Sequence, residues 1–262
     1  MSNNWHFLPA VELNSRTPVT NVLSIKRALI DRDIEELTKG RSRTQWSMGQ
    51  LTLNAYYSPP DSKFVMLQGI LQHPFFDEGY SDIENLGAIG AVIGHELGHG
   101  IDDKGARYDT QGKLRQWMSK QDLEEFKARG VKFVERFNKI GHNGVLTLGE
   151  NIGDHVGLTF GNKAAFPDPS KASQSKDNMA NADMLSRANM EDERKFFEAY
   201  ARLWCGVVRP EFEKTLLKTD PHSLGYARIN EQVIHQDAFH TAYQCKQTDK
   251  MYLKPEDRLR VW

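Results

Sequence analysis

The sequence of 262 residues has little cysteine, almost no net charge and no long apolar run. Two cysteines, Cys205 and Cys245, are too few for a disulfide-stabilised scaffold. Lys and Arg total 34 against 35 Asp and Glu, so the chain lacks the basic excess typical of nucleic-acid-binding proteins. No apolar stretch approaches the ~20 residues that cross a bilayer, and the N-terminus does not read as a signal peptide. We therefore expect no nucleic-acid partner and no membrane segment in this chain.

Large apolar side chains are plentiful by contrast. Hydrophobic residues make up 39% of the chain, with 13 Phe, 8 Tyr and 5 Trp, which excludes global disorder. The length suits one large domain or two small ones. No internal repeat with a period of about 20–50 residues is present, which excludes solenoids and propellers.

The spacing of apolar residues predicts a mainly α-helical chain with a small β-sheet, an α+β fold. Residues 51–57 and 63–71 predict a hairpin, because the intervening Ser58-Pro59-Pro60-Asp61 cannot continue a strand. Residues 167–190, rich in Pro, Ser, Asn, Asp and Lys, predict a surface loop. Helices are expected at 19–39, 81–105, 119–139, 147–163, 194–205 and 232–245.

Two of these helices begin with the pattern of a capping box, Ser81 with Glu84 and Thr147 with Glu150. The first also carries four glycines at spacings of three, four and four residues. Each interior glycine costs about 1 kcal/mol relative to alanine. Their shared stripe therefore predicts that another backbone packs closely against it. The four are Gly87, Gly90, Gly94 and Gly98.

Within the same helix lies Val92-Ile93-Gly94-His95-Glu96-Leu97-Gly98-His99. Two histidines four residues apart lie on one helical face, so their ring nitrogens can converge on a metal at about 2.0–2.1 Å. Glu96 would then project beside the metal and accept a proton from a polarised water. A chance occurrence of this short pattern on an ordinary helix is the alternative.

A catalytic zinc site usually has a third protein ligand and one open position. A histidine six residues after His99 would supply it in one class of zinc peptidase, but position 105 is Gly. A glutamate from a later helix is the remaining common choice. Glu150 is favoured because little charge surrounds it and Asp154, one turn on, can accept the second N–H of a ligating histidine. Glu124, Glu125 and Glu135 lie among Lys and Arg, as expected of a solvated face.

Asp102 and Asp103 extend the same reasoning to the end of the helix. Asp102 lies two turns after His95 and Asp103 one turn after His99, so either could orient a ligating ring. Acidic residues are not favoured at a helix C-terminus. This points to a functional reason for at least one of them.

Taken together, these motifs resemble the catalytic C-terminal part of the neprilysin and endothelin-converting-enzyme family of zinc metalloendopeptidases. The matching segments occur in the family's order over nearly the whole chain. They are Asn54-Ala55-Tyr56-Tyr57, Gly69 to Gln72, Pro74-Phe75-Phe76, Val92 to Asp103, Thr147 to Asp154, Trp204-Cys205-Gly206, Arg209-Pro210-Glu211, Asp220 to Ser223, Arg228 and Arg260-Val261-Trp262.

The resemblance implies a zincin fold of the thermolysin type, one Zn²⁺ per chain and a role for each matching residue. His95, His99 and Glu150 would bind zinc, and Glu96 would be the general base. Asp102 and Asp154 would each orient a ligating histidine, and Asp154 is counted with the catalytic residues. His222 would donate to the oxyanion. The implied substrate-binding residues are Asn54 and Ala55 on an edge strand, Arg228 at a substrate carbonyl, and Val92 and Trp204 in an apolar pocket.

Without the resemblance, Arg228 would be interpreted as a surface cation and His222 as a loop histidine. With it, residues 1–262 are expected to form a single catalytic domain that hydrolyses short peptides. The alternative is a truncated or split fragment that binds zinc or peptide but needs a partner or a missing half for turnover. A different hydrolase class on the same zinc site is weaker, because Asn54-Ala55 and His222 fit peptide chemistry.

Family members are typically far longer, so the resemblance also implies that their helical N-terminal half is absent. We therefore expect a peptide substrate and either a separate N-terminal half or a homo-oligomer as partners. Cys205 and Cys245 match positions that elsewhere bond to that half, which leaves them free, bonded to each other or bonded to another chain. The family is mostly extracytoplasmic, yet no export signal is found, so the location stays open.

Overall fold

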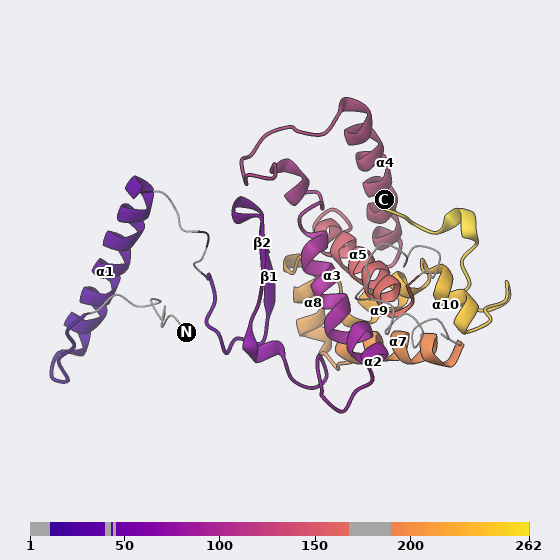
Figure 1. Ribbon diagram of the computed structural model, residues 1–262, viewed down its shortest axis with the longest axis horizontal. Helices are drawn as coiled ribbons and strands as arrows, with labels where there is room; N and C mark the ends of the chain where they lie inside the picture. Colours follow the sequence, from indigo (N-terminus) through magenta and orange to yellow (C-terminus); the bar gives the residue numbers. More distant parts are fainter. Residues whose placement is uncertain (1–10, 40–42, 44–45, 168–189, 262) are drawn as a thin grey trace, which may run out of the picture. The chain divides into compact units, whose positions relative to one another are not determined.

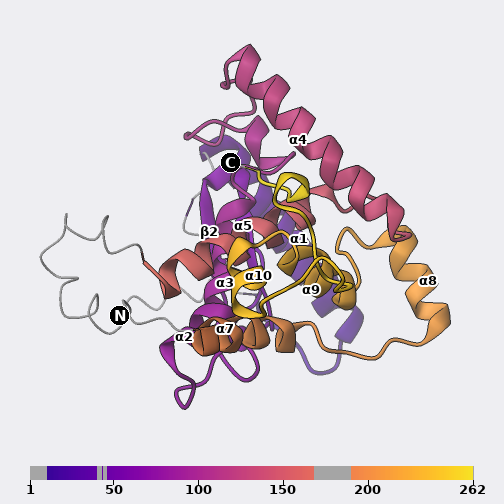
Figure 2. The same cartoon turned by 90° about the vertical axis from the view of Figure 1, so that its right-hand side faces the viewer.

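The computed structural model describes residues 11–39, 43, 46–167 and 190–261. The chain divides into two compact units, residues 1–50 and residues 51–262. In the first unit, helix α1 (Pro18–Lys39) confirms the helix expected at 19–39, and none of its residues is buried. The predicted site residues all belong to the second unit, which is drawn in Figures 1 and 2.

The second unit begins with the expected hairpin. Strands β1 (Ala55–Ser58) and β2 (Lys63–Met66) pair antiparallel, with Ala55 opposite Met66. A 3₁₀ turn at Pro59–Asp61 joins them, in keeping with the proline signal. Both strands are shorter than predicted. Residues 51–54 form turns, and a second 3₁₀ turn at Gln68–Ile70 ends the second strand.

The helix expected from Ser81 to residue 105 is present but interrupted and shorter. Its capping box is confirmed: the Ser81 hydroxyl accepts the Glu84 N–H, and the Glu84 carboxylate accepts the Ser81 N–H at 3.0 Å. Helix α2 (Asp82–Asn85) leads through a π-helical turn, Leu86–Gly90, into α3 (Ala91–Gly98). The expected end at 105 was wrong. The carboxylate of Asp102 accepts the N–H groups of Lys104 and Gly105 and so folds the chain back after α3.

The glycine stripe packs against other backbones, as predicted, at three of its four positions. α3 lies against α5 (Leu148–Ala165), and the two helices run side by side in both views (Figures 1 and 2). A Cβ added at Gly94 would lie 2.8 Å from the Cα of Gly157, and one at Gly87 would lie 2.3 Å from the carbonyl oxygen of Phe196. Gly98 meets Gly153 and Val156, whereas Gly90 faces only its own helix.

Helix α4 (Lys120–Lys139) confirms the helix expected at 119–139, and Ser119 caps it. The start of α5 differs from the prediction. Thr147 and Glu150 do not form a capping box. The Thr147 hydroxyl instead donates to the carbonyl of Asn143 and accepts an N–H of Asn151. The carboxylate of Glu150 is therefore available for other contacts.

The C-terminal part contains more breaks than expected. Helix α7 (Met190–Leu203) confirms the helix predicted around 194–205, whereas α8 (Pro210–Thr219) was not predicted. The single helix expected at 232–245 was wrong, since the chain forms α9 (Gly225–Val233) and α10 (Asp237–Ala242) with a break between them. The loop predicted at 167–190 lies almost entirely outside the described residues.

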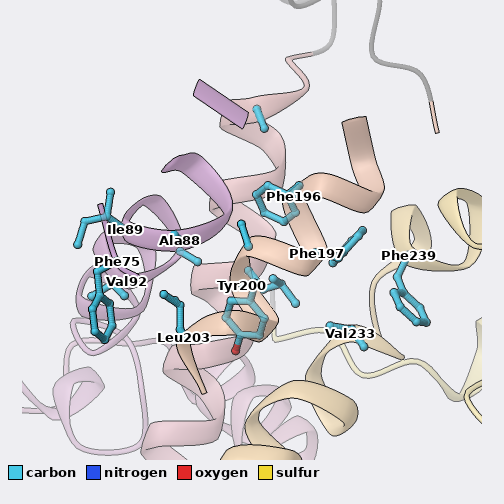
Figure 3. Packing of buried hydrophobic residues seen from close by; sticks show 14 of the residues in the cluster. Phe75, Ala88, Ile89, Val92, Phe196, Phe197, Tyr200, Leu203, Val233 and Phe239 are labelled. Atoms are coloured by element: carbon cyan, nitrogen blue, oxygen red, sulfur yellow. The ribbon is translucent and has the colours of Figure 1, made fainter. Parts of the chain in front are cut away.

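Two apolar clusters fill the second unit. The larger places Phe196, Phe197 and Tyr200 of α7 against the π-helical turn Leu86–Gly90 and α10, and Figure 3 shows Tyr200 between Leu203 and Val233. The smaller includes Phe133 and Phe137 of α4 with Ile152 of α5. The mainly α-helical prediction with a small sheet is confirmed. Among the described helices, none has the length and apolar character needed to cross a membrane. Cys205 and Cys245 are free thiols, so the bond between them is not formed.

Two neutral histidines, which pack against Phe133 of the smaller cluster, make stability depend on pH. Burial, with a contribution from the charge of Arg260, lowers the pKa of His155 to about 4, and burial beside other positive groups lowers the pKa of His235 to about 3. Below about pH 6.5 the unfolded chain binds protons that the folded chain binds only near these lower values. The free energy of unfolding should therefore fall as the pH falls from about 6.5 to 4, by up to about 1.4 kcal/mol per pH unit for each histidine.

Urea unfolding at a series of pH values, with chloride as the anion of the buffer, measures how the free energy of unfolding changes with pH. His155→Asn removes one titrating group and should flatten the pH dependence by about one proton. A slope in the variant equal to that of the wild type would show that His155 does not carry this effect.

Candidate metal centre

Three side chains from two helices converge in the second unit. His95 and His99 lie one turn apart on α3, and Glu150 lies in the first turn of α5. Glu150 Oε2 is 3.2 Å from His95 Nε2 and 3.5 Å from His99 Nε2. Within the part of the chain that the structure describes, these three form the one group of His, Cys, Asp or Glu compact enough to hold a metal ion. The competing glutamates of α4 are exposed, as expected of a solvated face.

The second nitrogen of each histidine is held by a carboxylate. His95 Nδ1 donates to Asp154 Oδ1 at 2.8 Å, and His99 Nδ1 donates to Asp102 Oδ2 at 2.7 Å. Because an ionised carboxylate can only accept, the neutral form of each ring carries its proton on Nδ1 and its lone pair on Nε2, on the side facing Glu150. Of the two candidates at the end of α3, the contact is made by Asp102 and not by Asp103.

This donor set fits a zinc ion. Two imidazole nitrogens and one carboxylate oxygen are ligands that zinc accepts in catalytic sites. Glu150 Oε2 is buried and forms no hydrogen bond, although three ring nitrogens lie within 3.5 Å of it. A cation bound between these atoms would supply the interaction that this oxygen lacks.

The charges around the centre favour ionised carboxylates and protonated imidazoles when no metal is bound. Burial alone would raise the pKa of Glu150, but His222, His95 and His99 hold it well below its ordinary value. Burial likewise opposes the charge on Asp154, yet Arg228 and His95 lower its pKa to about 2. For His99, the carboxylates of Asp102 and Glu150 outweigh burial and raise the pKa to about 10. A metal ion must therefore displace protons to bind.

Glu96 lies on α3 between the two histidines in sequence. The side chain is 6% exposed, and its Oε2 atom has no hydrogen-bond partner among the described residues. Burial raises the pKa of this carboxyl above its ordinary value. A buried carboxylate with an unoccupied oxygen and a raised pKa is well suited to accept a proton.

His222 reaches the centre from the loop between α8 and α9. Its Nε2 lies 3.1 Å from Glu150 Oε2, while its backbone N–H donates to Asp220 Oδ1 at 2.8 Å. The next two residues anchor this loop. The Ser223 hydroxyl donates to Asn151 Oδ1 at 2.7 Å, and the Leu224 N–H donates to His142 Nε2 at 3.1 Å.

Sequence reasoning missed these anchors. Asn151 and His142 join the loop to α5 and to the turn after α4, across 72 and 82 residues of chain. Ser223 stands in a segment that carries the family resemblance, but nothing local indicates its partner. The one sequence feature that points to an anchoring role for Asn151 is its position directly after Glu150.

Arg228 is buried, so its interpretation as a surface cation was wrong. Its Nε and Nη2 atoms donate to both oxygens of Asp154, at 2.8 and 2.6 Å. The guanidinium also lies 3.5 Å from the centre of the Trp204 ring, a cation–π contact. The pair of Asp154 with Arg228 therefore links the His95 ring to the indole of Trp204.

The remaining predicted residues lie on α3, at the start of β1 and directly after α7. Val92 of α3 and Ala55 of β1 are buried in the larger apolar cluster, and Trp204 packs against that cluster. Asn54 is exposed, and its Oδ1 accepts the Ala55 N–H at 3.0 Å. β1 itself contacts α3, the helix of the two histidines. The substrate-binding roles of these residues stay predictions.

Comparison with known proteins identifies the family. A model of peptidase family M13 matches residues 54–259. An endothelin-converting enzyme homolog of Locusta migratoria is 34% identical over 247 residues, which are 92% of this chain and 33% of that protein. Human neprilysin is 32% identical over 250 residues, which are 92% of this chain and 32% of neprilysin.

A solved structure extends the likeness to the fold. The zinc metalloprotease ZMP1 of Mycobacterium tuberculosis, in complex with an inhibitor, has a TM-score of 0.78 at 32% identity, over 94% of this chain and 38% of that one. The present chain spans about one third of the length of the curated relatives it matches. The family model covers most of the chain, and relatives above 30% identity cover nearly all of it, so the chain belongs to peptidase family M13.

Proposed function

We propose that this chain is the catalytic part of a zinc-dependent endopeptidase that hydrolyses peptide bonds in short peptides. The observation that carries the proposal is the convergence of His95, His99 and Glu150, with each histidine held by its own aspartate. When bound there, zinc would lower the pKa of a water molecule and polarise the substrate carbonyl. His95, His99 and Glu150 would hold the metal, one ion per chain.

The chain's own groups supply the proton transfers. Glu96 accepts the proton of the attacking water and passes it to the leaving amine. His222 donates a hydrogen bond to the developing oxyanion, an assignment supported by its Nε2 lying at the ligand carboxylate. Asp154 and Asp102 keep the ligating rings in the required tautomer.

The substrate is proposed to lie along β1. Asn54 and Ala55 at the start of this strand would hydrogen-bond an extended peptide as an additional strand. Arg228 would bind the carbonyl after the scissile bond, and Val92 and Trp204 would contact the side chain on that side. Val92 is buried in the larger apolar cluster and Trp204 packs against that cluster, which supports a preference for apolar side chains.

A second candidate follows from the share of the relatives that the chain covers. In this second candidate function, the chain binds zinc and peptide but requires further polypeptide, in the same or a separate chain, for efficient turnover. Cleavage by residues 1–262 alone distinguishes the two functions.

Metal removal tests the proposal directly. We expect about one zinc per chain, loss of peptide cleavage on treatment with a chelator, and recovery on addition of zinc. Metal analysis by mass spectrometry and a fluorogenic peptide assay measure the two quantities on one sample. Cleavage that persists in zinc-free protein would rule out the mechanism, whereas zinc-loaded but inactive protein would favour the second candidate.

A further inference from the structure

Among the buried polar atoms of the second unit that lack a hydrogen-bond partner, six lie at two places. Two of them, on Glu96 and Glu150, belong to the metal centre. Four others surround a cavity beside the middle and the C-terminal part of α5. They are His155 Nδ1, Asn162 Nδ2, His235 Nε2 and Gln236 Nε2. Buried polar groups in proteins are normally hydrogen-bonded, so a cluster of unpaired ones indicates a missing partner.

The cavity measures about 290 Å³ and is formed by three segments of the chain. One face of α5 contributes His155, Thr159 and Asn162, which recur at helical spacing. The break between α9 and α10 contributes His235 and Gln236, and the C-terminal segment contributes Arg260 and Val261. The volume holds a few water molecules or one small ligand.

Three of the four unpaired atoms, those of Asn162, His235 and Gln236, are N–H groups and therefore hydrogen-bond donors. His235 Nδ1 accepts the Leu259 N–H at 3.1 Å, which leaves the proton of the neutral ring on Nε2. The Thr159 hydroxyl donates to the carbonyl of His155 at 2.8 Å and lies 3.3 Å from Gln236 Oε1, and the amide nitrogen of Gln236 has no partner. The side chains of His235 and Gln236 are more than nine-tenths buried, with exposures of 4% and 8%. The amide of Asn162 adds further N–H groups.

The charged side chains in the wall of the cavity also favour a negatively charged ligand. The wall contains two basic residues, Lys163 and Arg260, and one acidic residue, Asp237. Asp237 is paired with Arg260 at 2.6 Å. The charge of Arg260, together with burial, lowers the pKa of His155 to about 4 and keeps that ring neutral. A metal cation is disfavoured, because Lys163 and Arg260 in the wall would repel it.

We propose that this cavity binds a small oxyanion, a phosphate or a carboxylate group, through the N–H groups of His235, Gln236 and Asn162 and the charges of Arg260 and Lys163. Oxyanions present several acceptor oxygens, which match a wall of unpaired donors. The site is distinct from the metal centre and independent of the proposed peptidase activity.

Calorimetric titration of the zinc-loaded chain with inorganic phosphate, and separately with acetate, tests the site at constant ionic strength. Chloride serves as the reference anion. We expect saturable binding of at least one oxyanion, and the stronger of the two identifies the preferred class. Gln236→Leu should weaken that binding by about tenfold or more, because one hydrogen bond to a charged ligand is lost. Gln121→Leu, on the exposed side of α4, is the matched control and should bind as the wild type does.

Thermal unfolding without an oxyanion shows whether Gln236→Leu has simply damaged the fold. Removing an unpaired buried donor should leave the melting temperature unchanged or raised, while the increase caused by the oxyanion disappears. Absence of saturable binding in the wild type would overturn the proposal. Undiminished binding in both Gln236→Leu and Asn162→Leu would place the anion elsewhere, for example on zinc, and would also overturn it.

Discussion

Replacing Glu96 with Gln is expected to lower kcat for peptide cleavage by about 10²- to 10⁴-fold, the usual contribution of a general base. Glutamine keeps the shape of the side chain but cannot accept the proton of the attacking water. Since Glu96 is not among the three ligands, the zinc content should stay at one per chain. Steady-state kinetics and metal analysis on the same preparation measure both effects.

Glu124→Gln is the control for this experiment. Glu124 is an exposed glutamate on α4 with a side chain that is 68% accessible, so its replacement should leave kcat unchanged. If Glu96→Gln retained the wild-type kcat, another group would have to be the base. Loss of zinc together with activity would instead show that Glu96 supports the ligands.

Replacing Asp154 with Ala is expected to have the largest effect on stability. The carboxylate is 2% exposed and contacts the buried guanidinium of Arg228 as well as the ring of His95. Removing one partner of a buried ion pair leaves the other charge uncompensated, at a cost of about 3–5 kcal/mol. Zinc affinity should also fall by about 10- to 100-fold, because His95 loses the acceptor that orients it.

Urea unfolding of zinc-free protein and competition with a chelator separate these two losses. Asp154→Asn keeps an acceptor for the His95 N–H, so it should retain more zinc affinity than Asp154→Ala. Asp31→Ala, which removes an exposed ion pair with Arg27, should change the free energy of unfolding by less than about 1 kcal/mol. A zinc-free Asp154→Ala protein as stable as the wild type would contradict the role assigned to the buried pair.

The parts of the site that could be predicted from sequence are those set by helical spacing. His95, Glu96 and His99 follow from one turn of helix, and Asp154 follows from its position one turn after Glu150. Asp102 and Asp103 could not be separated, since the choice depends on how the chain turns after α3. That turn is made by Asp102 itself, through hydrogen bonds to Lys104 and Gly105.

The parts that could not be predicted depend on contacts across long stretches of sequence. The Arg228 side chain meets Asp154 across 74 residues, and nothing near Arg228 indicates burial. The break between α9 and α10 interrupts a region of continuous helical spacing, and the His235 that follows α9 accepts a backbone N–H from Leu259. Helix α8 has no buried residues, but its Phe212 and Leu216 lie one turn apart, a signal that was available in the sequence.

The glycine contacts between α3 and α5 have a consequence for how the metal site tolerates change. A Cβ at Gly157 would lie 2.3 Å from the carbonyl oxygen of Ala91, so no side chain stands between the two helices at this crossing. The separation of His95 and His99 from Glu150 is thereby fixed by main-chain contact rather than by the volume of core side chains. Apolar residues around α7 could be exchanged without altering the ligand spacing, whereas one added methyl group at this crossing would change it.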